Sequence, residues 1–226
     1  MPQNVAHSRW FDVMAFHRRL LVVLLSFDIL LILTSGVLRV ATVGDFIPTT
    51  PAFLNIGNDW SAGEILNYLK WTLMIAVFLF AWHVTGLRLY AALAFFACLV
   101  LSDDALQLHE RGSEMLMSVF PDLRRDNGSA TEIVIWIMIG LLGVSAVWTG
   151  LRGAPNSELE KVRMVGLLFV PIVFFGVVVD AMHVVAESQG HHKASWILLL
   201  VEDGGEMLAI SVLAAHVVAS FRPQAR

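Results

Sequence analysis

Residues 20–42 read LLVVLLSFDILLILTSGVLRVAT, an almost unbroken apolar stretch interrupted by the charges of Asp28 and Arg39. A helix needs about 20 mostly apolar residues to cross the hydrocarbon core of a membrane. This stretch is long enough, and it exceeds the roughly 7–15 apolar residues of a cleavable signal segment. It therefore predicts a transmembrane helix that is retained in the protein.

The rest of the chain continues this pattern. Of its 226 residues, 57% are hydrophobic and only 15% are charged, against roughly 25% charged in soluble domains. A membrane is the solvent that tolerates so much apolar surface. We expect an all-α fold, a polytopic membrane helical bundle that forms a single domain over residues 1–226. The predicted spans number about six and cover about 20–42, 65–85, 89–110, 131–150, 164–187 and 196–220.

The distribution of positive charge predicts an orientation. With the N-terminus inside, nine of the fifteen Lys and Arg fall in cytoplasmic parts, and Lys70 is among the six on the outer side. Cytoplasmic segments carry the excess of Lys and Arg, so we expect both termini inside. The net charge of -4 is modest and has no basic block. This excludes the electrostatic footprint of a nucleic-acid-binding protein.

Three of the predicted spans carry acids and histidines that an apolar helix would not be expected to hold. A carboxylate at mid-membrane costs roughly 2.5–3.5 kcal/mol on insertion scales, so such residues usually have a function. In the predicted orientation all three groups fall in the outer third of the bilayer. The segments are LSDDALQLHE at 101–110, VDAMHVVAE at 179–187 and VEDGGEM at 201–207.

Carboxylates mixed with imidazole are typical ligands of Zn, Fe or Mn. The Asp180-x-x-His183 spacing places two such groups one helical turn apart, as in helical bundles that hold two metals. We therefore predict a divalent-metal site, with one metal or two. The predicted ligands are Asp103, His109, Glu110, Asp180, His183, Glu202 and Glu206. On a continuous third helix, Asp103, Gln107 and Glu110 would share one stripe. Asp104 and Asp203 are the candidate general bases, or groups just outside the ligands.

Three other functions stay open. A proton or metal-cation transporter could use Asp28, which we expect to pair with a neighbour such as Ser26, as a step inside the membrane. Two b-type haems could use His83 and His216 together with the histidines of the acidic segments. A structural subunit of a membrane complex would need none of this chemistry, and its acids would only join helices.

Two of the acidic segments resemble an uncharacterised family of bacterial multipass membrane proteins. That family has an Asp-Glu…His-Glu segment in a middle span and a Glu-Glu-x-x-Glu-Met-Leu segment in the last span. Asp103-Asp104 with His109-Glu110 corresponds to the first, and residues 202–208 correspond to the second. Asp104 and Asp203 replace glutamates and have a shorter reach.

The resemblance implies a multi-pass protein of the bacterial inner (cytoplasmic) membrane with an acidic-histidine site, and it implies no particular reaction. A site in the outer third of the bilayer would be open to membrane lipids. It would also admit a lipid-like or periplasmic small molecule as substrate. The sequence therefore favours a membrane metalloenzyme over the other functions.

Overall fold

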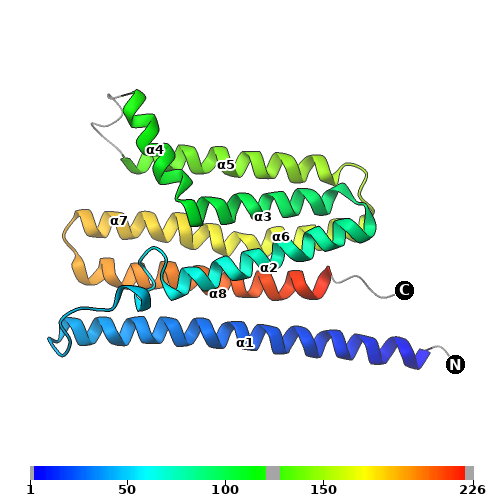
Figure 1. The fold of residues 1–226 in the computed structure, drawn as a ribbon, viewed down its shortest axis with the longest axis horizontal. Coiled ribbons are helices and arrows are strands. Elements are labelled where there is room, and N and C mark those ends of the chain that lie inside the picture. The colour runs from blue at the N-terminus through cyan, green and yellow to red at the C-terminus, as the bar shows by residue number, and fades with distance from the viewer. Residues whose placement is uncertain (1–2, 121–127, 222–226) are drawn as a thin grey trace. The chain divides into compact units, whose positions relative to one another are not determined.

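The computed structural model describes residues 3–120 and 128–221, with side chains from 16–120 and 131–221, and over these residues every regular element is a helix. The all-α prediction is therefore confirmed (Figure 1). The elements are α1 (Gln3–Val43), the short 3-10 helix η1 (Ala52–Leu54), α2 (Ala62–Thr85), α3 (Arg88–Leu106), α4 (Leu108–Val119), α5 (Gly128–Leu151), α6 (Asn156–Val173), the π-helix η3 (Phe174–Val179), α7 (Asp180–Ser188) and α8 (His192–Ser220).

Five stretches of the described chain are long and apolar enough to cross a membrane, and they coincide with the first five predicted spans. They are Phe16–Val43, Ala62–Thr85, Arg88–Leu106, Thr131–Leu151 and Asn156–Ser188. Large apolar side chains such as Leu30, Leu33 and Val37 are more than half exposed, as expected of surfaces that face lipid. The sixth predicted span forms α8, which carries three acids in its first half and is not among the five.

The described chain divides into two compact units. The first contains residues up to Lys70 together with residues from Glu160 to the end of α8, and the second contains residues 71–159. In the first unit α8 packs against α1 along one side and against η3 and α7 along another (Figure 1). The close approach to α1 depends on Gly204, where an added Cβ would lie 3.2 Å from Ile32.

In the second unit α3 and α4 both pack against α5. The third predicted span, 89–110, is wrong as one continuous helix, because the helix breaks at Gln107. This residue has φ 52° and ψ 48°, the left-handed conformation, so α3 ends at Leu106 and α4 starts in a new direction. Asp103, Gln107 and Glu110 therefore do not form the single helical stripe that their spacing predicted.

Candidate metal centre

The first part of the site comes from the segment that follows α6. Pro171 lies near the end of α6 and has no N–H to donate. The helix then widens into η3 over Phe174–Val179, and α7 begins at Asp180. Single π turns inside α-helices are frequent at functional sites. Asp180 and His183 are one turn apart on α7, so they point to the same side.

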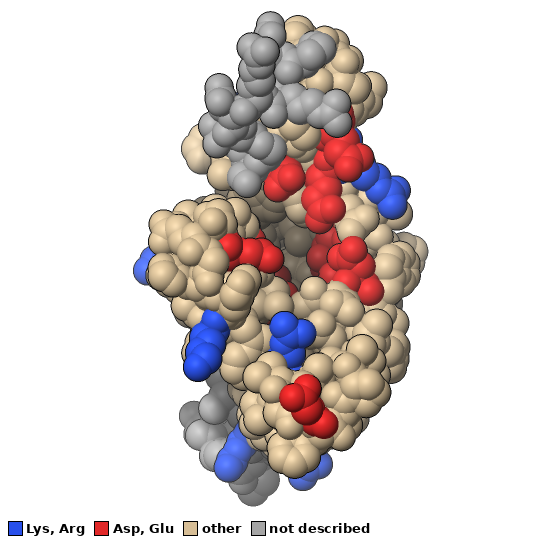
Figure 2. All heavy atoms as spheres, turned by 90° about the vertical axis from the view of Figure 1, so that its left-hand side faces the viewer, with Lys and Arg blue, Asp and Glu red and all other residues tan. Residues whose placement is uncertain are grey.

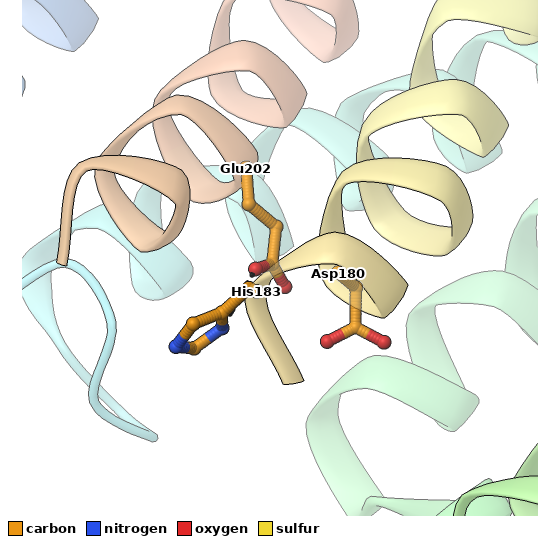
Figure 3. A group of neighbouring side chains, drawn as sticks. All are labelled: Asp180, His183 and Glu202. Atoms are coloured by element: carbon orange, nitrogen blue, oxygen red, sulfur yellow. Dashed lines mark hydrogen bonds and ion pairs between the residues drawn. The ribbon is translucent and has the colours of Figure 1, made fainter. Parts of the chain in front are cut away.

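Glu202 on α8 meets these two residues. Its Oε2 lies 3.2 Å from Nδ1 of His183. One ligand atom from each of Asp180, His183 and Glu202 lies within 4.8 Å of the other two. Figure 3 shows the Glu202 side chain reaching from α8 toward both α7 residues. The His183 and Glu202 side chains are only 16% and 15% exposed, so the three groups form a small, half-buried carboxylate-histidine cluster.

The charges of this cluster call for a compensating group. The Glu202 carboxyl interacts with that of Asp180 as well as with His183. Two carboxylates in contact away from bulk water repel each other, so a proton or a cation must lie between or beside them. Glu187 adds a further acid at the edge, with its Oε2 3.9 Å from Nε2 of His183. Since Nδ1 of His183 faces Glu202, Glu187 is on the far side of the ring.

Glu206 lies one turn beyond Glu202 on α8. Its carboxylate packs directly against Gly176 in η3, in the space that any side chain at position 176 would occupy. Phe175 packs in the same way against Gly205 of α8. The two glycines thus let η3 and α8 approach closely. Glu206 is not part of the three-residue cluster, so its role as a ligand stays a prediction.

The three other predicted ligands belong to the second unit, where they lie close to one another. Asp103 Oδ1 accepts a hydrogen bond from the backbone N–H of His109 (3.0 Å) and lies 3.1 Å from the His109 ring Nδ1. The carboxylate therefore caps the first turn of α4, where the helix dipole favours negative charge. Glu110 is half exposed, and its Oε1 is 3.8 Å from Nε2 of His109. The break at Gln107 brings His109 back onto Asp103.

The predicted general bases are both half-buried: Asp104 in α3 of the second unit and Asp203 in α8, next to Glu202.

Figure 2 shows the end of the molecule at which α7 finishes and α8 starts, and acidic side chains are visible on its surface. A single centre that joins all seven predicted ligands remains a prediction.

One sequence-based assignment is wrong in the interior of the first unit. Asp28 does not pair with Ser26, whose hydroxyl donates to the Val22 carbonyl. It pairs instead with Lys70, which is only 2% exposed and whose Nζ lies 2.6 Å from Asp28 Oδ1. Sequence reasoning missed this pair. The available signal was one acid in the first apolar span and one base in the second, of opposite charge.

The histidines considered as haem ligands differ in exposure and in the groups next to them. His83 near the end of α2 is exposed. His216 on α8 is half-buried, and its Nε2 lies 3.3 Å from the Ser220 hydroxyl. The histidines of the acidic segments face carboxylates, His183 toward Glu202 and His109 toward Asp103.

Comparisons with known proteins place the chain in a family. The family model described as a domain of unknown function, DUF8692, matches residues 19–220. Searches of curated proteins and of solved structures gave no match. The match runs from the first predicted span to the end of α8, and so includes both acidic groups. The chain therefore belongs to the DUF8692 family.

Proposed function

We propose that this protein is a membrane-embedded metal-binding protein, and specifically a metalloenzyme, with Asp180, His183 and Glu202 as its core ligands. The observation that carries the proposal is the convergence of three ligand atoms within 4.8 Å from two helices. Ligand atoms on one tetrahedral ion at about 2.0–2.1 Å lie roughly 3.3 Å apart. The 3.2 Å between His183 Nδ1 and Glu202 Oε2 already fits this spacing.

The ligand set supports a catalytic rather than a purely structural site. Three protein ligands leave a coordination position open, as in catalytic zinc sites, whereas structural sites have four. Mixed carboxylate and imidazole ligands suit Zn, Fe or Mn. A metal there would act as a Lewis acid on water, oxygen or substrate. Asp203, the neighbour of Glu202, is the proposed general base.

The wider assignment follows the sequence. We propose six spans with α8 as the sixth, both termini in the cytoplasm, and a single domain in a bacterial inner membrane. In this orientation the end of α7 and the start of α8 lie toward the outer face. Lipid-like or periplasmic small molecules are the substrate class that such a site would admit.

Metal content of the purified protein tests the proposal. Detergent-solubilised protein is expected to retain a transition metal in stoichiometric amount, measured by elemental analysis. His183→Ala and Glu202→Gln should each remove it. His216→Ala is the matched control, because His216 is also on a packed helix but contacts only Ser220 among the hydrogen bonds described. Normally folded wild-type protein that binds neither Zn, Fe nor Mn would contradict the proposal.

A second measurement separates binding from transport. Protein reconstituted into liposomes should bind metal without carrying it across the bilayer. Metal accumulation inside the vesicles that is lost in Glu202→Gln would instead support the cation transporter. In that case the cluster would be a transport site.

A further inference from the structure

A buried polar network joins three helices of the first unit. The ammonium of Lys70 on α2 lies 2.6 Å from Asp28 Oδ1 on α1, 3.0 Å from Asn67 Oδ1 and 3.1 Å from the backbone carbonyl of Met207 on α8. The hydroxyl of Ser211 donates to the other oxygen of Asp28 at 2.5 Å. Asp28 and Ser211 are fully buried.

The hydrogen bonds of this network match those of a charged pair. An ammonium has three donors and no acceptor, and Lys70 has three acceptors around it. Each Asp28 oxygen receives one donor. No donor of Lys70 remains for passing a proton onward. A fully satisfied network of this kind holds its members in one arrangement, because any shift leaves a buried charge without its partner.

The network contacts α8 about one turn away from the metal centre. Met207 follows Glu206 directly, and it lies five residues, about 7.5 Å along the helix axis, from Glu202. At 100° per residue, Gly204 and Ser211 share a face that is opposite Glu202. Gly204 packs on Ile32 of α1. One face of α8 is therefore held by contacts with α1 and α2, while the opposite face, toward η3 and α7, carries Glu202.

We propose that Lys70 and Asp28 are positioning residues for the metal centre. They fix the rotation and depth of α8, so that Glu202 meets His183 across the contact with α7. The metal-affinity part of this inference rests on the proposed function. The claim that Lys70 and Asp28 fix the position of α8 does not rest on the proposed function, and a cross-linking rate measures it without metal.

The test variant replaces both charges at once. Asp28→Leu with Lys70→Met leaves no unpaired buried charge, and replacing a buried ion pair by apolar residues of similar volume is often neutral for stability. We expect thermal unfolding in detergent to stay near that of the wild type, and metal affinity to fall about 10- to 100-fold, as for residues that orient ligands. Ser35→Ala is the control, since Ser35 is buried on α1 and its hydroxyl accepts a hydrogen bond from the Ile56 amide.

A cross-link measures the register without metal. A Cβ built on Gly205 lies 2.6 Å from Cγ of Phe175. The two Cβ atoms would therefore be at most about 4 Å apart, close to the mean of about 3.8 Å in disulfides. Gly205→Cys with Phe175→Cys, in a Cys98→Ser background that removes the only native cysteine, should cross-link rapidly on mild oxidation. All three core ligands are kept.

The outcomes are separable. We expect the Asp28→Leu, Lys70→Met change to slow this cross-link at least tenfold and the Ser35→Ala change to leave it unaltered. An unchanged cross-linking rate in the charge-free variant would overturn the inference, whether or not the wild type binds metal. If that variant does not fold, Ser211→Ala, which removes one donor from Asp28 and keeps the ion pair, takes its place under the same criterion. Wild-type protein without metal, but with the expected cross-linking difference, would refute only the proposed function.

Discussion

Gly205→Ala is the change that most directly probes the contact between α8 and η3. The new Cβ would lie 2.6 Å from Cγ of Phe175 and closer still to two other ring atoms. Carbon atoms in good contact are about 3.5–4.0 Å apart. The ring or the helix must therefore move by about 1 Å. A ring edge held between two helices is less free to move than the tip of a long side chain.

A matched control isolates the cost of this clash. Gly166→Ala, in the helix that leads into η3, would place its Cβ where no atom lies within 4 Å. Both substitutions gain the same helix propensity, about 1 kcal/mol. Their difference in unfolding free energy is therefore the overpacking term, about 1–3 kcal/mol. With about 2–4 °C per kcal/mol for a chain of this size, Gly205→Ala should unfold measurably below Gly166→Ala in detergent.

The same 1 Å displacement should weaken metal binding. Phe175 and His183 belong to one continuous helical stretch, so pushing η3 away from α8 moves His183 away from Glu202. Metal-ligand distances tolerate only about 0.2 Å. Zinc titration is expected to show reduced affinity in Gly205→Ala and unchanged affinity in Gly166→Ala.

A double-mutant cycle supplies the refuting result. Phe175→Ala removes the three atoms nearest to the new Cβ, all of which lie closer than 3 Å, so the overpacking cost of Gly205→Ala should disappear in that background. An equal stability cost with and without the Phe175 ring would show that the close contact is not what requires glycine. Equal unfolding temperatures for Gly205→Ala and Gly166→Ala would contradict the reasoning in the same way.

Three further predictions concern other parts of the chain. Gln107→Gly should raise stability by about 0.5–1 kcal/mol and Gln107→Val should lower it, because a left-handed residue with a Cβ is strained; unfolding midpoints of the two variants check this. The hydrogen bond to Asp103 raises the pKa of His109 above its usual value, so the stability that this pair contributes is present at low pH and is lost as pH rises through the raised pKa; NMR titration should show a lower His109 pKa in Asp103→Asn. Glu187→Gln should lower metal affinity about tenfold, because a carboxylate behind a ligating imidazole orients the ring; a zinc titration with His216→Ala as control measures this.

The sequence was sufficient for the helices and for part of the site. Long apolar runs predict helices directly, and the first five predicted spans are five apolar helical stretches of the described chain. The Asp180-x-x-His183 spacing predicted two groups on one side of a helix, and these two are in the cluster with Glu202. Periodicity is a local property, so it determines which side chains of one helix point together.

Other features depend on contacts that a single sequence does not display. No Gly or Pro near Gln107 indicates in the sequence that the helix breaks there. The break is stabilised by Asp103, which caps the next helix. The pairing of Lys70 with Asp28 was missed because the two residues are 42 positions apart. Which helix faces which is decided by such pairings between distant residues, and these are invisible in the local pattern.

The π-helix η3 has a consequence for the angular phase of the segment that carries Asp180 and His183. A π turn holds one surplus residue, and each residue of an α-helix corresponds to a rotation of about 100°. Everything after Val179 is therefore turned by about that angle relative to an uninterrupted continuation of α6. Without the surplus residue, the same sequence would aim both side chains more than a quarter of a circle away from Glu202. A deletion of one residue within 174–179 would thus turn Asp180 and His183 away from Glu202, while α6 and α7 would form one longer and more regular helix.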